Sequence, residues 1–188
     1  MSTERITAGR PRSSSRSTIE EAAAELFLEQ SYGGTTVDEI TQRAGVSRAT
    51  FFNYFDAKSD LLWMDADRAL DALDARLANG AELIDAVSAT ASEIGPERVP
   101  LAVTQAEVMG TGEELVSSGL VRVGRLVSMV RAAIMAHPPQ EHDELVVAVR
   151  ANVLAGALVA AWSTWIRGGV ERRPLSRYLD EAIALVQL

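Results

Sequence analysis

Residues 36–47 constrain the fold of this chain more than any other segment. Thr36 and Glu39 form a capping box, in which each side chain satisfies a free backbone amide of the other residue, so a helix begins after Thr36. Gly45 accepts the left-handed conformation that ends a helix in a sharp turn. Ser47 is a favoured N-cap, so another helix begins just beyond the glycine. The segment predicts two short helices joined by a tight turn.

Helix signals continue on both sides of this segment. Thr18 with Glu21 predicts a capping box at the start of the first helix, and Thr111 with Glu114 predicts another further along. Asp56 is the expected N-cap of a long fourth helix, and strand signals are nearly absent. The predicted helices are, in approximate bounds, 18–30, 36–44, 47–55, 56–77, 81–93, 97–109, 112–136, 141–168 and 175–187. The fold class is therefore all-α, with an N-terminal three-helix helix-turn-helix domain followed by a helical bundle.

Charge is distributed unevenly along the chain, whose net charge is −8. Residues 1–16 are rich in Arg, Ser, Pro and Gly, and we expect a flexible basic arm there. A basic arm on an acidic body predicts that one end of the molecule meets a polyanion. Cysteine is absent, which excludes disulfides, thiolate zinc sites and a thiol nucleophile.

The most apolar stretch, residues 151–166, is bounded by Arg150 and Arg167. It is shorter than the roughly 20 residues of a membrane-spanning helix, so we expect a buried helix and no membrane partner. The N-terminus has charge but no apolar signal segment. These features predict a cytoplasmic protein.

The two short helices are spaced as in a helix-turn-helix, whose second helix enters the major groove of DNA. Arg48 can pair with guanine or hold a phosphate, Asn53 can pair with adenine or a phosphate, and Ala49 and Thr50 suit thymine methyl groups. Arginines of the arm suit an A·T-rich minor groove, although the arm is equally explained as a solvated tail. The predicted DNA-binding residues are Arg10, Arg12, Thr36, Ser47, Arg48, Ala49, Thr50, Phe52, Asn53, Tyr54 and Lys58.

The segment "AAAELFLEQSYGGTTVDEITQRAGVSRATFFNYFDAKSDLL", residues 22–62, resembles the DNA-binding domain of the TetR family of bacterial transcriptional regulators. The resemblance implies a homodimeric, all-helical repressor with a ligand-binding C-terminal bundle. Two positions depart from the family pattern: Phe52 stands where tyrosine is usual, and Thr41 where alanine is usual. The expected domains are the arm, 1–16, the DNA-binding domain, 17–62, and a ligand-binding and dimerisation domain, 63–188.

The C-terminal domain is expected to dimerise and to hold an effector. The last two helices carry a stripe of small residues and an apolar face, which also suit packing within one subunit. The predicted dimer residues are Asn152, Gly156, Ala160, Ser163, Tyr178, Leu179, Ala182, Ile183 and Val186. The predicted pocket residues are Trp63, Val103, Gln105, Met109, Leu120, Val123, Val127, Val130, Asn152 and Trp162, for each of which core packing is an alternative.

Residues 148–169 also resemble the branch of the family that responds to acyl-CoA or similar hydrophobic ligands. The resemblance implies an acyl chain in the apolar interior, with Arg122 or Arg125 meeting a phosphate.

Other functions find little support in the sequence. His137 and His142 are spaced five apart and have no supporting cluster of metal ligands. The segment "GTGEEL" lacks the preceding strand of a nucleotide-binding loop. We expect no enzyme activity, no cofactor and no metal. The alternative function is a constitutive DNA-binding dimer without a small-molecule effector.

Overall fold

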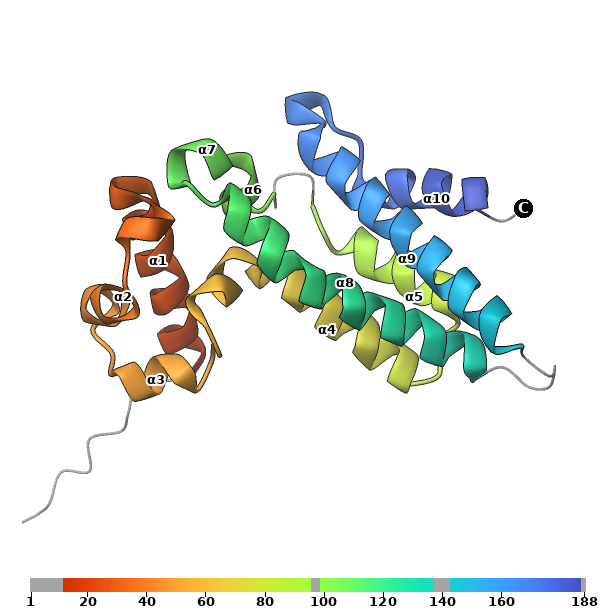
Figure 1. Cartoon of the computed structure of the whole chain (residues 1–188), viewed down its shortest axis with the longest axis horizontal. Helices are drawn as coiled ribbons and strands as arrows, with labels where there is room; N and C mark the ends of the chain where they lie inside the picture. Colours follow the sequence, from red (N-terminus) through yellow and green to blue (C-terminus); the bar gives the residue numbers. More distant parts are fainter. Residues whose placement is uncertain (1–11, 96–98, 137–142, 187–188) are drawn as a thin grey trace, which may run out of the picture.

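The computed structural model describes residues 12–95, 99–136 and 143–186, and these residues form helices and no strand. Figure 1 shows two parts along the long axis of the molecule, a small N-terminal group of helices and a longer bundle. The helices are α1 (Arg12–Gly34), α2 (Val37–Ala44), α3 (Arg48–Phe52), the 3-10 helix η1 (Lys58–Leu62), α4 (Met64–Ala78), α5 (Leu83–Ser92), α6 (Leu101–Thr104), α7 (Ala106–Met109), α8 (Gly112–Met135), α9 (Glu144–Arg167), η2 (Gly169–Glu171) and α10 (Leu175–Val186). The predicted all-α fold is confirmed.

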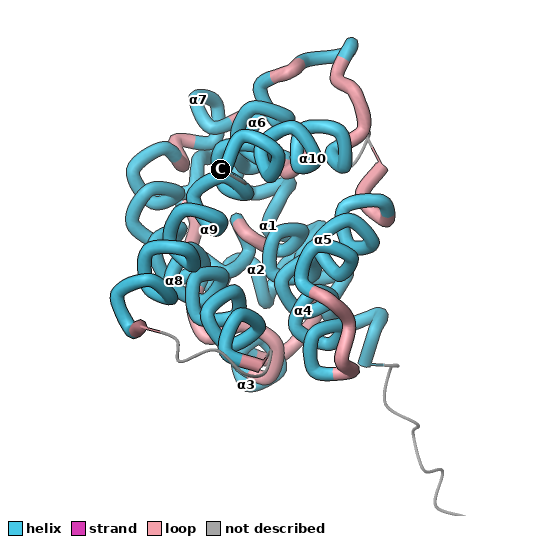
Figure 2. Tube along the Cα trace, turned by 90° about the vertical axis from the view of Figure 1, so that its right-hand side faces the viewer, coloured by secondary structure: helices cyan, strands magenta, loops and turns pink. Residues whose placement is uncertain are grey.

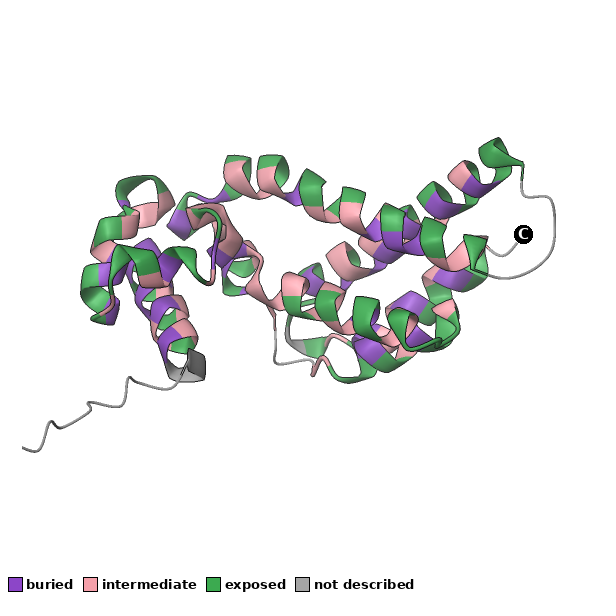
Figure 3. Cartoon of the chain, turned by 90° about the horizontal axis from the view of Figure 1, so that it is seen from below, coloured by how far each residue is buried: buried purple, intermediate pink, exposed green. Residues whose placement is uncertain are grey.

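Each of the two parts has its own hydrophobic core. The first lies among α1, α2, α3 and η1, and Phe27, Ile40 and Phe51 are almost fully buried in it. Met109, from α7, also belongs to this core, because α7 packs against α1. The second core lies among α4, α5, α8, α9 and α10, with Trp165 at 0% exposure. Seen from below in Figure 3, buried residues line the inner sides of the long helices.

The first helix begins at Arg12, so the prediction that it begins at Thr18 is wrong. Thr18 lies inside α1 and its capping box does not start the helix. The other end agrees with the sequence, because Ser31 has φ 67° and ψ 163° and interrupts the helical backbone just after Gln30. Arg16 belongs to α1, not to a flexible arm, and its guanidinium lies 5.3 Å from the centre of the Phe55 ring.

The helix-turn-helix is built as the sequence predicts. The side chain of Thr36 accepts from the Glu39 amide at 3.2 Å, and a Glu39 carboxylate oxygen accepts from the Thr36 amide at 2.8 Å. Gly45 is left-handed, with φ 65° and ψ 34°, and the Ser47 hydroxyl accepts from the Thr50 amide at 3.0 Å. α3 ends at Phe52 and is shorter than expected.

Two predicted caps are replaced by other contacts. Asp56 does not begin the fourth helix; the Asp60 carboxylate folds back and accepts from the amides of Asp56 and Ala57, both at 2.9 Å. α4 therefore begins only at Met64. Thr111 does not cap α8, because its buried hydroxyl donates to the Ala102 carbonyl at 2.8 Å.

The apolar helix α9 packs against α8 and α10 in the bundle. By length and composition alone it could cross a membrane, and it is the one such helix in the described ranges. It buries Val147, Ala155, Trp165 and Ile166 in the second core. Figure 1 and Figure 2 both show α9 beside α8 and α10, and one side of α9 packs into the second core.

Candidate nucleic-acid interface and effector cavity

The outer face of α3 is free of contacts with the rest of the domain core. α2 and α3 pack against α1 through Ile40, Ala44 and Phe51, which are buried. This packing leaves the opposite side of α3 outward. Arg48, Ala49, Phe52 and Asn53 are exposed there, and Thr50 and Tyr54 are partly exposed. The predicted recognition residues therefore share one surface.

Arg48 is held by two side chains on that surface. Its guanidinium donates to the carboxylate of Asp38, on α2, and lies 5.3 Å from the centre of the Phe52 ring. Both charged side chains of the pair are more than half exposed. Asp38 was not predicted as part of the site, and a DNA phosphate or base must compete with its carboxylate for Arg48.

The two helix N-termini on this side are capped by polar side chains. The Thr36 hydroxyl donates to the Glu39 carboxylate at 2.7 Å, and the Ser47 and Thr50 hydroxyls are hydrogen-bonded at 2.8 Å. Hydrogen bonds from Thr36 lower the pKa of Glu39 below its usual value. A carboxylate thus already occupies the positive end of α2, while the start of α3 carries only hydroxyl groups.

Lys58 is held by backbone carbonyl groups at the end of α1 and just after it. Its ammonium donates to the carbonyl oxygens of Tyr32 and Thr35, both at 2.7 Å, and lies 3.9 Å from the centre of the Tyr32 ring. Burial lowers the pKa of Lys58. The side chain ties the end of α1 to η1, and its contact with DNA stays a prediction.

Arg43 was missed by sequence reasoning and fixes α2 on α1. Its guanidinium donates to Glu29 at 2.9 and 2.7 Å and to Glu25 at 3.2 Å. The hydrogen bonds from Arg43 lower the pKa of Glu29. Of the predicted arm residues, Arg10 lies outside the described residues and Arg12 is the first residue of α1. Their contact with a minor groove stays a prediction.

The bundle contains a cavity of about 460 Å³ between α4, α5, α8, α9 and α10, called the bundle cavity below. Its wall is almost entirely apolar. The residues that line it are Trp63, Ala66, Ala69, Leu70, Leu73, Val87, Thr90, Ala91, Ile94, Val116, Gly119, Leu120, Arg122, Val123, Leu126, Leu158, Val159, Trp162, Ser163, Leu175 and Leu179. Four predicted pocket residues are among them, namely Trp63, Leu120, Val123 and Trp162.

The other six predicted pocket residues lie elsewhere. Val130 is buried in the second core, and Val103 and Val127 pack against that core. Met109 is buried in the first core, and Gln105 is exposed. Asn152 is exposed on α9, where its amide donates to the Ala148 carbonyl.

Three polar side chains of the cavity wall, Trp63, Thr90 and Arg122, are already hydrogen-bonded within the chain. The Trp63 indole donates to the Ser118 hydroxyl at 2.8 Å, and the Thr90 hydroxyl donates to the Ala86 carbonyl at 2.8 Å. The Arg122 guanidinium is held by Asp67 and Asp60. Arg125, outside the wall, is paired with Asp71 and Asp74. Neither arginine predicted to meet a phosphate is therefore without a carboxylate partner.

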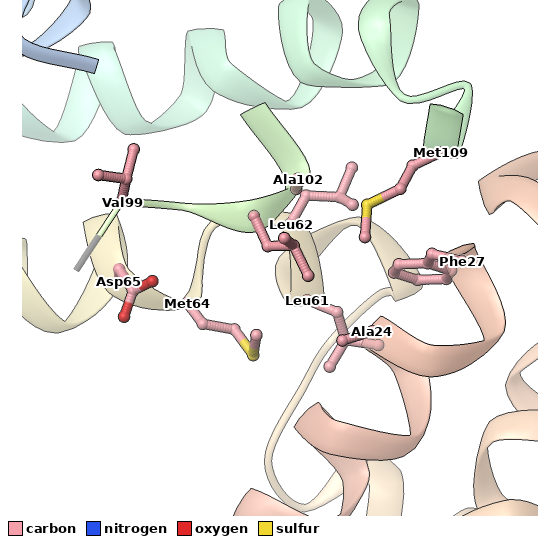
Figure 4. A pocket seen from close by; sticks show the side chains of 10 residues that line it. Ala24, Phe27, Leu61, Leu62, Met64, Asp65, Val99, Ala102 and Met109 are labelled. Carbon is pink, nitrogen blue, oxygen red and sulfur yellow. The ribbon is translucent and has the colours of Figure 1, made fainter. Parts of the chain in front are cut away.

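A smaller cavity of about 150 Å³ lies where the two parts of the molecule meet. Figure 4 shows Phe27 and Ala24 of α1 on one side of it, Leu61, Leu62 and Met64 below, and Ala102 and Met109 above. Asp65 is the one charged residue in its wall. This cavity shows that Met109 faces the joint between the domains, not the bundle interior.

The predicted dimer residues divide between the surface and the core. Asn152, Gly156 and Ala160 are exposed on α9, beside exposed Val149 and Val153. Ser163, Tyr178, Ala182 and Val186 are partly exposed. Leu179 and Ile183 are buried in the second core, so these two pack within the subunit and the prediction that they meet a partner is wrong.

The comparisons with known proteins agree with this geometry. Residues 19–62 match the family model "Bacterial regulatory proteins, tetR family". Two curated relatives match part of the chain. A mycofactocin biosynthesis transcriptional regulator, MftR of Mycobacterium tuberculosis, is 35% identical over 71 residues, 38% of this chain and 36% of that protein. The transcriptional activator FasR of Mycolicibacterium smegmatis is 35% identical over 63 residues, 34% of this chain and 29% of that protein. The matches thus span about a third of each relative.

Solved structures share the fold along nearly the whole chain. NalD, the secondary repressor of a multidrug efflux pump in Pseudomonas aeruginosa, superposes with a TM-score of 0.55 at 18% identity, covering 92% of this chain and 96% of that one. FadR of Thermus thermophilus, a TetR-family repressor in complex with lauroyl-CoA, superposes with a TM-score of 0.51 at 22% identity, covering 90% and 92%. Residues 19–62 are thus similar to the N-terminal domain of the tetR family of bacterial regulatory proteins, and the chain as a whole shares the fold of these solved structures.

Proposed function

We propose that this chain is a cytoplasmic transcriptional regulator that binds operator DNA as a homodimer, represses, and is released when a small apolar effector fills the bundle cavity. The observation that carries the proposal is the outward face of α3, where Arg48, Ala49 and Asn53 stand free of the domain core. The residue types on that face are those that contact base edges in a major groove.

Dimerisation follows from the small size of this face. α3 spans five residues, so a single copy reaches few base pairs. Two copies related by a two-fold axis would read two half-sites about one helical turn apart. The exposed stripe on α9 suits such contact, because Val149 and Val153 offer apolar area and a Cβ at Gly156 would meet nothing within its own subunit. Partner helices can therefore approach closely there.

The chemistry of the bundle cavity favours an uncharged, apolar effector body. A volume of about 460 Å³ lies within the range of small-molecule sites. Burying a charged group against hydrogen bonds that are already made would cost free energy without a new partner. An acyl chain fits this wall, whereas the phosphates of an acyl-CoA would stay outside it. The lauroyl-CoA bound by FadR is a ligand of that type.

DNA binding is tested by selecting duplexes from a random library with the full chain and measuring their affinity by fluorescence anisotropy. We expect a two-fold symmetric sequence. Arg48→Ala should reduce discrimination between the selected duplex and its base variants by roughly 5- to 150-fold, equivalent to 1–3 kcal/mol. Arg173→Ala, which also removes an exposed arginine paired with an acid, is the matched control. Failure to select any sequence would refute the proposal, and unchanged discrimination in Arg48→Ala would refute base contact by this residue.

The effector is tested on the same duplex with lauroyl-CoA, lauric acid and dodecanol added separately. Release by any of them, lost when Ala66→Trp fills the cavity, would support an apolar effector. The constitutive alternative predicts unchanged DNA affinity with each compound and with an extract of small molecules from cells.

A further inference from the structure

Arg122 touches both the bundle cavity and the segment that follows the recognition helix. It lies on α8 and forms part of the cavity wall. Its guanidinium donates to Asp67, on α4, at 3.0 and 2.7 Å, to Asp60, on η1, at 3.0 Å, and to the Ser118 carbonyl at 3.1 Å. Four of its five N–H groups are thus engaged, and the side chain is only 14% exposed.

Asp60 extends this connection toward α3. One of its carboxylate oxygens accepts from Arg122, and the other accepts from the backbone amides of Asp56 and Ala57. These two residues lie directly after Phe55, whose ring is buried against Phe51 of α3. A single carboxylate therefore joins the cavity wall to the backbone that leaves the recognition helix.

Trp63 lies between the cavity and the same connection. It lies between η1 and α4, lines the cavity, and stacks on Trp162 with ring centres 6.0 Å apart. The Arg122 guanidinium lies 5.5 Å from the centre of the Trp63 ring. The ring also lies against Gly119, where an added Cβ would come within 2.9 Å of it. The Trp63 ring is therefore in contact with Gly119, Ser118 and Arg122. A ligand in the cavity that displaces the ring must disturb these contacts.

We propose that Arg122 is the positioning residue that couples the bundle cavity to DNA binding, by holding Asp60 on the backbone amides that follow the recognition helix. The proposal rests on the proposed function and adds the residues that carry its regulation. Displacing Trp63 moves Arg122 relative to Asp60, and the loop at residues 56–57 and the orientation of α3 change with it.

The test replaces the unidentified effector by a methyl group inside the wall. Gly119→Ala pushes on the Trp63 ring, and Gly124→Ala, on the same helix with no atom within 4 Å of its added Cβ, is the matched control. Ser118→Ala removes the acceptor of the Trp63 indole and provides a milder second variant, with Ser117→Ala as its control, because both hydroxyls donate to the Glu114 carbonyl. Each change is also made in an Asp60→Asn background, in which the amide oxygen still accepts from the backbone but the charged partner of Arg122 is lost.

Two readouts separate this proposal from the DNA-binding function. The amide resonances of Asp56 and Ala57 in the DNA-free protein report the coupling directly, with the indole resonance of Trp63 as the measure of displacement. We expect Gly119→Ala and Ser118→Ala to shift both sets of resonances and to change affinity for the selected duplex by about fivefold or more. The control variants should do neither, and the Asp60→Asn background should abolish the effect.

A shifted Trp63 indole with unmoved amides of residues 56 and 57, or an equal effect in the Asp60→Asn background, would overturn the coupling. If the wild-type chain selects no duplex, the proposed function fails, and the amide resonances still decide whether the cavity and the loop are connected.

Discussion

Lys58 offers the sharpest test of whether a residue at the DNA-binding end is structural or contacts DNA. It is the only lysine of the chain, and its ammonium donates to two carbonyl oxygens at 2.7 Å. Hydrogen bonds from charged groups contribute about 1.5–3 kcal/mol each. Because Lys58 is partly exposed, water replaces part of this hydrogen-bond energy in the variant. The cost of burying the ammonium, which also lowers the pKa of Lys58, offsets a further part. We therefore expect Lys58→Met, which keeps the apolar stem, to lower the free energy of unfolding by about 2 kcal/mol.

The measurement is urea unfolding followed by circular dichroism, with a thermal scan alongside. A loss of about 2 kcal/mol corresponds to a fall in Tm of roughly 4–8 °C for a chain of this size. Arg173→Met, which breaks an exposed ion pair with Glu181, should cost at most about 1 kcal/mol and serves as the control. The structural role would be refuted if Lys58→Met were as stable as the wild type but had lost DNA affinity. That result would support the contact with the DNA backbone that the sequence suggested.

Three further predictions follow from single contacts. Thr111→Val should lower the free energy of unfolding by about 1–2 kcal/mol in urea unfolding, because the fully buried Thr111 hydroxyl no longer donates to the Ala102 carbonyl at 2.8 Å. A neutral effect would mean that water replaces the hydroxyl. Asp38→Asn should tighten binding to the selected duplex up to about fivefold in anisotropy titrations by freeing Arg48, and weaker binding would instead make Asp38 a residue that orients Arg48. Burial raises the pKa of Tyr32 to about 12, so folding favours the neutral phenol. This contribution to stability is complete below pH 10 and is lost as the pH rises through 12. Ultraviolet titration of the wild type against Tyr32→Phe measures the pKa of Tyr32, and ionisation near pH 10 would contradict the burial.

The parts of the fold that the sequence predicts are those set by near neighbours in the chain. The caps at Thr36 and Ser47 and the turn at Gly45 involve residues within four positions of each other, so the helix-turn-helix follows from local chemistry. Asp56 and Asp60 are chemically alike, however, and only the folded backbone decides that Asp60 is the one that turns back.

Contacts between distant segments were not predictable in the same way. Lys58 finds its partners 26 and 23 residues earlier in the chain, at carbonyl groups that no side-chain pattern reveals. Val130 and Val123 have the same apolar character, yet Val130 fills the core and Val123 lines the cavity. Periodicity identifies an inward face, but it does not show which helices leave a space between them.

The placement of α7 has a consequence for any attempt to exchange modules between regulators. Met109 is 1% exposed and packs in the same core as Phe27, although it lies 82 residues later in the chain. In a hybrid joined after Leu62, another residue or none would take the place of Met109 in that core. The apolar wall of the smaller cavity would then face solvent. Functional chimeras of this protein should therefore inherit two separate stretches from one parent, the first helices together with residues 99–111, and a single crossover point should give insoluble products.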